Sequence, residues 1–127
     1  MKAYVVDSAA VRSNLQQLQT RAGSAVLWAV LKGDGYGLGL LPMAAICREA
    51  GVTHFAVTEV SEVNRLRAGG FADASILMLR PTSEQDELRQ LLQFGAILTV
   101  SSQNDAAVLN GVAQELGVQA EVHVKID

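Results

Sequence analysis

The sequence has a single cysteine, Cys47, among its 127 residues, so an internal disulfide bond is impossible. Chains without disulfides are typical of reducing compartments, and we therefore expect a cytoplasmic protein. Residues 1–6 reach the charged Asp7 too early to form a secretory signal peptide. No apolar run approaches the length of a transmembrane helix, so we expect no membrane segment.

Basic runs and aromatic residues are also scarce. The ten lysines and arginines are scattered and the formal net charge is −3, which argues against nucleic acid as a partner. Aromatic residues make up 5% of the chain, so the core must be mainly aliphatic. No partner motif for a catalytic thiol flanks Cys47, which favours a small core residue over a nucleophile. There is no low-complexity segment and no linker, and the length suits one modest domain.

Helix and strand patterns alternate along the chain. A helix is predicted over residues 8–22, and Asp7 or Ser8 can cap it. Each later strand pattern is separated from the next by a helix pattern. The predicted strands cover residues 25–31, 54–57, 75–79, 96–100 and 120–126. This alternation predicts a parallel α/β sheet with right-handed crossovers. The pattern alone leaves open a flat doubly wound sheet or an arc of a (β/α)8 barrel.

Several helix boundaries are marked by particular residues. Pro42 fits the first turn of the second long helix. Thr58 can cap the next helix, with Glu59 and Glu62 in its first turn, where carboxylates favour the helix dipole. The helix after that is predicted to open at residues 81–83. Ser102 can cap the last helix, because an acidic residue follows three positions later.

The stretch from Ala25 to Gly39 carries the strongest chemical signal. Residues 25–31 are apolar and have the right length for a strand buried on both faces. Lys32 follows, and the next seven residues contain four glycines. Such a loop lets its amides approach an anion, while the amine can form a Schiff base with a carbonyl. An amine and a site for an anion are what a protein must supply to bind pyridoxal phosphate. A solvated lysine before an ordinary turn fits the pattern as well.

Other phosphate-binding motifs fail on spacing. G-x-G-x-x-G would need a glycine at one of three positions, which are occupied by Leu38, Leu40 and Pro42. The motif G-x-x-x-x-G-K-[ST] is absent as well, because Lys32 precedes the glycines instead of following them. The dinucleotide and nucleoside triphosphate interpretations are therefore rejected.

Residues 32–39, preceded by Ala-Val-Leu, resemble the pyridoxal-phosphate motif of the alanine racemase family. The usual family motif reads lysine, alanine, aspartate or asparagine, alanine, tyrosine, glycine, histidine, glycine. This chain keeps the lysine and the tyrosine, but it has Gly33 and Gly35 at the two alanine positions and Leu38 at the histidine position. The resemblance implies that Lys32 binds the cofactor covalently and is one of two catalytic bases. It also implies that Tyr36 reaches the cofactor phosphate.

The last strand shows a second likeness. Residues alone favour a half-exposed edge strand here, in which polar residues such as His123 and Lys125 alternate with valines. Residues 122–127 also resemble a second racemase motif, in which a lysine is often carbamylated and orients an arginine further along. Lys125 is the matching position. His123 would be a lumen residue that packs or forms hydrogen bonds.

The resemblance extends over nearly the whole chain and favours the N-terminal half of a (β/α)8 barrel, with parallel strands one to five. A closed barrel takes about 250 residues, so residues 1–127 are predicted to be a partial cofactor-binding barrel domain of a longer enzyme. In the family, a C-terminal β-domain of the partner subunit supplies the second base, a tyrosine. This implies a homodimer, and it implies that residues 1–127 alone are inactive.

The activity implied by the resemblance is interconversion of L- and D-alanine for the supply of cell-wall precursors. The sequence leaves two alternatives open. One is a non-enzymatic barrel protein that binds pyridoxal phosphate for its homeostasis. The other is a relative that racemises serine or basic amino acids, or that decarboxylates an amino acid.

Overall fold

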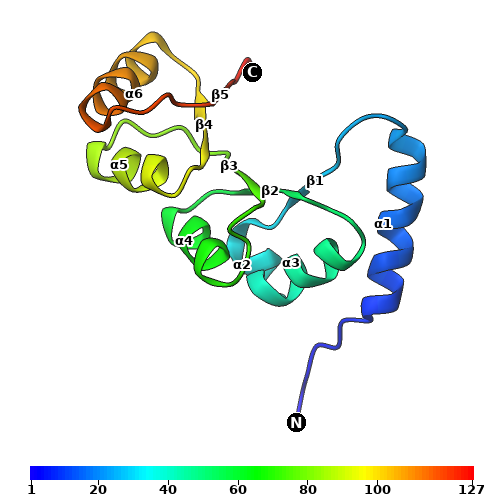
Figure 1. Ribbon diagram of the computed structural model, residues 1–127. Coiled ribbons are helices and arrows are strands. Elements are labelled where there is room, and N and C mark those ends of the chain that lie inside the picture. The colour runs from blue at the N-terminus through cyan, green and yellow to red at the C-terminus, as the bar shows by residue number, and fades with distance from the viewer.

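Five short strands lie side by side in chain order in one parallel sheet (Figure 1). The computed structural model describes residues 1–127. The strands are β1 (Trp28–Val30), β2 (His54–Val57), β3 (Ser75–Met78), β4 (Ile97–Val100) and β5 (Val122–Val124). Parallel neighbours in simple chain order, joined by helices, are the arrangement of a (β/α)8 barrel and not of a doubly wound sheet.

The sheet is curled, as contacts between side chains of its two edge strands show. The rings of Trp28 on β1 and His123 on β5 are 5.6 Å apart between centroids, and they contact edge to face. In a flat sheet these strands would be separated by four spacings of about 4.8 Å each. Trp28 also packs edge to face against His54 of β2, at 4.7 Å. The three rings therefore lie on the concave side, which corresponds to the lumen of a barrel.

The helices cover the other side of the sheet. Figure 1 shows α3 to α6 along one side of the strands and α1 standing beside α3 at one end. The helices are α1 (Ser8–Ala22), α2 (Lys32–Tyr36), α3 (Leu40–Glu49), α4 (Val60–Ala68), α5 (Gln85–Gln93) and α6 (Gln103–Leu116). None of these helices combines the length and the hydrophobicity that a transmembrane segment requires.

The core lies between the sheet and helices α3 to α6. It is a single cluster of 19 buried residues that is mostly aliphatic, as the scarcity of aromatic residues predicts. Phe55 and Phe71 are fully enclosed exceptions and contact each other edge to face, 5.5 Å apart. Cys47 is buried in this cluster, and burial raises the pKa of its thiol, as suits a packing role.

Several predicted boundaries need correction. β1 is shorter than residues 25–31, and only one of its faces is buried: Leu31 is 5% exposed, whereas Val26 is 60% exposed. The other face lines the open concave side. Thr58 does not cap α4. Glu59 is the N-cap residue, and the Glu62 carboxylate returns to its backbone amide. Helix α5 begins at Gln85, later than the predicted residues 81–83.

Other predicted features are confirmed. Helix α1 spans Ser8–Ala22, and the Asp7 carboxylate caps it by accepting hydrogen bonds from two backbone amides. Pro42 lies in the first turn of α3. The Ser102 hydroxyl caps α6 by accepting from the backbone N–H of Asp105 at 3.1 Å. Local side-chain chemistry was sufficient to place these helix ends.

Candidate active site

A cavity of about 580 Å³ opens at the carboxyl ends of the strands on the concave side. Lys32, Arg80 and Lys125 line it, each placed just after a strand or one residue further. The remaining lining residues are Thr58, Leu77, Leu79, Pro81, Thr99 and His123. No carboxylate is among them, so the lining carries positive charge. Such a lining suits an anionic ligand, and this edge is where barrel enzymes carry their chemistry.

Lys32 follows directly after the last hydrogen bond between β1 and β2. The Leu31 backbone N–H still donates to the Ala56 carbonyl of β2, at 2.8 Å, and the Leu31 side chain is buried in the core. The next side chain along, that of Lys32, is exposed and lines the cavity. The β1–β2 ladder and the buried leucine therefore fix the backbone directly behind the amine.

The glycine-rich segment after Lys32 forms a left-handed helical turn and not an open loop. Gly33, Asp34 and Gly35 have φ values of 62°, 55° and 65°, and Tyr36 has a φ of 56°. Glycine reaches this region without a steric penalty, whereas a residue with a Cβ atom loses about 1–2 kcal/mol there. Two glycines at these positions therefore lower the strain of the turn.

The turn uses most of its own amides, which corrects the prediction of an amide-lined anion seat. The backbone N–H of Gly35 donates to Leu31 O at 2.9 Å, and that of Gly37 donates to Gly33 O at 2.9 Å. The N–H of Gly39 donates to Asp34 O at 2.8 Å. Donors already satisfied inside the turn are not available to a phosphate, which leaves the basic side chains of the cavity as the candidates for binding an anion.

Helix α4 holds this turn from outside. The backbone N–H of Asp34 donates to the Glu62 carboxylate at 2.9 Å. The Asp34 carboxylate accepts from the backbone N–H of Leu40 at 3.0 Å and from the Arg65 guanidinium at 2.9 Å. The Leu40 amide, and next the Arg65 guanidinium, lower the pKa of Asp34 below its usual value. Asp34 is therefore anionic at neutral pH and links the two ends of the turn.

Arg80 joins the carboxyl ends of β2 and β3 beside the cavity. Its Nε donates to the Thr58 carbonyl at 3.1 Å, and its Nη atoms donate to Glu87 at 3.1 and 3.3 Å. A weaker contact of 3.4 Å reaches Glu59. The hydrogen bond from Arg80 lowers the pKa of Glu87, and the same bond raises that of Arg80. The guanidinium is thus held rigidly at the cavity wall.

Of the predicted site residues, the structure brings Lys32 and Lys125 to one cavity but leaves Tyr36 outside it. Tyr36 is 64% exposed and is not among the lining residues. His123 lies on the concave side, as predicted, and packs against Trp28. Lys125 lies near Asp127, with 3.5 Å between Nζ and Oδ2. Its backbone N–H donates to Val100 O at 2.9 Å, which continues the β4–β5 ladder past β5.

Sequence reasoning missed Arg80, Thr99 and the second role of Glu62. Arg80 had a readable signal, because it is a charged residue directly after an apolar strand pattern, the same signal that singled out Lys32. Thr99 is buried, and its hydroxyl donates to Met78 O at 2.7 Å, a pairing that depends on strand order. Glu62 was predicted only as a residue of the first turn of a helix.

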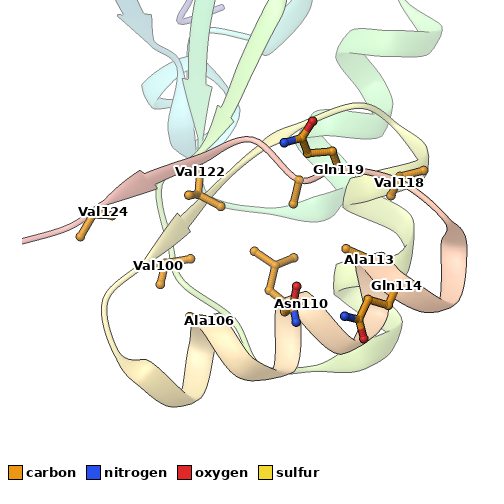
Figure 2. A pocket seen from close by; sticks show the side chains of 11 residues that line it. Val100, Ala106, Asn110, Ala113, Gln114, Val118, Gln119, Val122 and Val124 are labelled. Carbon is orange, nitrogen blue, oxygen red and sulfur yellow. The ribbon is translucent and has the colours of Figure 1, made fainter.

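A second cavity, of about 530 Å³, lies between β4, β5 and α6, away from Lys32. Figure 2 shows the side chains around it, which include Val100, Val122 and Val124 from the strands and Ala113 from α6. Its lining is mainly apolar and contains no titratable group. It offers packing surface and no acid, base or nucleophile.

Comparison with known proteins identifies the family of this fold and site. Residues 6–127 match the family model described as the N-terminal domain of alanine racemase. The chain belongs to the alanine racemase family. The match includes Lys32 and its glycine-rich turn, so the resemblance seen in residues 32–39 is confirmed as family membership. The fold, five parallel strands alternating with helices, is that of the N-terminal half of the alanine racemase barrel.

Individual relatives agree with the family model. The chain is 35% identical over 119 residues to an alanine racemase of Desulforamulus reducens, and 36% identical over 123 residues to one of Beutenbergia cavernae. These alignments cover 93% and 97% of this chain, and 32% of each relative. A solved alanine racemase of Clostridium difficile 630, in complex with cycloserine, superposes with a TM-score of 0.87 at 29% identity. That superposition covers 99% of this chain and 35% of the neighbour. The chain thus spans about a third of the length of the relatives it matches.

Proposed function

We propose that the full-length protein is a pyridoxal-phosphate-dependent racemase that interconverts L- and D-alanine. The observation that supports this most directly is the exposed amine of Lys32 in a basic cavity at the carboxyl ends of the strands of an alanine racemase barrel. The names of the matched relatives favour alanine as the substrate. We further propose that residues 1–127 are a partial barrel domain, that the enzyme acts as a homodimer, and that it works in the cytoplasm.

The residues of the cavity fit the cofactor. Pyridoxal phosphate is an aldehyde that carries an anionic phosphate, so it needs an accessible amine and positive charge nearby. Lys32 supplies the amine, and Arg80 and Lys125 add positive charge. The volume of about 580 Å³ lies within the range of small-molecule sites. When bound, the cofactor supplies an electron sink for the carbanion that forms at the amino acid α-carbon.

The proposed role of Lys32 is to bind the cofactor aldehyde covalently, then to move a proton at its Nζ atom on one face of the substrate α-carbon. The β1–β2 ladder fixes the backbone behind Lys32, which supports a defined position for its amine. Tyr36 is proposed to reach the cofactor phosphate, which would require its exposed side chain to turn toward the cavity. Carbamylation of Lys125 remains a prediction.

Covalent labelling tests the proposal, and residues 1–127 contain three lysines whose labelling can be compared: Lys2, Lys32 and Lys125. The longest natural form would be incubated with pyridoxal phosphate, reduced with borohydride and mapped by peptide mass spectrometry. We expect the pyridoxyl group on Lys32. Even labelling of all three lysines would contradict the cofactor assignment. Chiral chromatography of alanine incubated with the same protein tests the reaction itself, and labelling without racemisation would favour a non-enzymatic cofactor-binding protein.

A further inference from the structure

Glu62 is the only charged residue of the chain that is buried, with 5% of its surface exposed. A carboxylate in such a place is costly unless hydrogen bonds satisfy both of its oxygens. Its oxygens accept three backbone N–H groups from two parts of the chain. The Glu62 carboxylate is therefore fully hydrogen-bonded to the backbone, and its partners show which two segments it connects.

The two oxygens of Glu62 serve different segments. Oε2 accepts from the backbone N–H groups of Thr58 and Glu59, at 3.2 and 3.3 Å, and so completes the start of α4. Oε1 accepts from the backbone N–H of Asp34 at 2.9 Å, in the left-handed turn that follows Lys32. Capping of α4 accounts for the first oxygen only. The second joins the lysine turn to the carboxyl end of β2, at Thr58, which itself lines the cavity.

The turn needs such external support. Asp34 and Tyr36 adopt left-handed backbone angles that residues with side chains avoid, and such conformations persist only where the surroundings enforce them. Arg65, one turn further along α4, binds the Asp34 carboxylate at 2.9 Å, but this pair is about half exposed and so contributes little. The buried contact to Glu62 is therefore the stronger of the two links between α4 and the turn.

We infer that Glu62 is a positioning residue for Lys32: its Oε1 atom fixes the left-handed turn, and through the turn it sets where the amine lies in the cavity. The inference rests on the proposed role of Lys32 as the cofactor lysine. Glu62 lines no part of the cavity and acts through the backbone of Asp34.

Glu62→Gln in the longest natural form tests this role. An amide has one acceptor oxygen, so it cannot satisfy N–H donors on both sides, and either the helix start or the turn loses its partner. Because Oε2 is tied to the helix start by two amides, we expect the turn to lose its contact. Hydrogen exchange of residues 33–39 should then rise while exchange within α4 stays unchanged. Labelling of Lys32 by pyridoxal phosphate and borohydride should slow about tenfold, the scale of one hydrogen bond to a charged group.

Glu59→Gln is the matched control, because it removes a carboxylate from the same helix start but forms no hydrogen bond to the turn. It should leave both exchange of the turn and the labelling rate near wild type. If Glu62→Gln does not fold, Glu62→Asp keeps the charge on a shorter side chain and should loosen the turn in the same way. In Glu62→Gln and in Glu62→Asp, kcat for alanine should fall more than KM changes.

Unchanged exchange in residues 33–39, or equal effects of Glu59→Gln and Glu62→Gln on labelling, would overturn the inference. Failure of the proposed function has a different signature: wild-type protein would show no preferred label at Lys32, whereas the exchange measurement would still report whether Glu62 holds the turn. The positioning role would then be withdrawn together with the cofactor assignment.

Discussion

The two edge strands of the sheet are each followed by a lysine, but the two lysines lie in very different surroundings. β1 and β5 each have three residues, and a lysine that lines the same cavity follows each of them closely. Around Lys32, Leu31 is 5% exposed and Leu40 is fully buried, whereas every residue from 121 to 127 is exposed. The turn after Lys32 is tied to α4 through two side chains, while the side chain of Lys125 is paired only with Asp127.

This difference shows that charge and position along a strand do not by themselves define a functional lysine. The residues of this chain fix the backbone on both sides of Lys32, so its amine can serve chemistry that needs a defined geometry. Residues 1–127 hold Lys125 by a β-ladder and one exposed ion pair, which constrains a side chain weakly. Substitutions at the two strand ends should therefore differ in their effects.

The largest effect is expected from exchanging the two lysines for alanine one at a time. Lys32→Ala should abolish pyridoxyl labelling of the full-length protein and reduce racemisation to background, because no other lysine follows β1 at the cavity. Lys125→Ala should leave the label on Lys32 and reduce the rate only in part. Both variants should unfold near the wild-type temperature in circular dichroism, since both side chains are exposed. Loss of the Lys32 label in Lys125→Ala would show that both lysines are needed for cofactor binding.

The open edge at β5 predicts self-association of the isolated 127-residue chain. Val122, Val124 and Ile126 are 43%, 71% and 92% exposed, and an unpaired apolar edge strand invites another strand. Sedimentation should show dimers or larger species, and Val124→Lys should shift them toward monomer. Val5→Lys, in the exposed N-terminal segment, is the control and should change nothing. A compact monomer at high concentration would argue against the half-barrel description.

Tyr36→Phe tests whether the exposed tyrosine of the turn reaches the cofactor. Loss of one hydrogen bond to a charged phosphate should weaken cofactor binding by about 0.5–3 kcal/mol while the Lys32 label still forms. Tyr4→Phe is the matched control, because Tyr4 is 97% exposed and lies outside the site. Titration of absorbance with pyridoxal phosphate measures both. Equal affinities for wild type and Tyr36→Phe would remove Tyr36 from the cofactor site.

The smallest effect is expected from adding one methyl group to the left-handed turn. Gly35→Ala places a Cβ atom 3.4 Å from Leu40 N and from Met43 Cγ, at a φ of 65°. Gly117→Ala has the same φ but open space around it. Each should lower the free energy of unfolding by about 1–2 kcal/mol, the cost of the left-handed region. Only Gly35→Ala should also slow labelling of Lys32. An equal slowing in Gly117→Ala would indicate a general loss of stability.

The family resemblance, together with local patterns, was sufficient to predict the N-terminal half of the barrel. Caps such as Asp7 and Ser102 were readable because they act within three residues of the helix start. The face of β1 was predicted wrongly, since whether Val26 is covered depends on what lies across the concave side. The prediction that the amides of the glycine-rich segment bind an anion was also wrong. Glycine permits left-handed angles, but glycine content does not say which donors the turn satisfies internally.

The alternation of strands and helices, the mainly aliphatic core and the place of Lys32 at the end of the first strand could be predicted from the amino-acid sequence alone. These follow from the periodicity of apolar residues and from a motif contained in eight consecutive positions. Two features depend on the folded arrangement: Lys32, Arg80 and Lys125 share one cavity, and the Glu62 carboxylate reaches the Asp34 amide 28 residues away. Such contacts arise from the curvature and register of the sheet, which bring together groups that no local pattern connects.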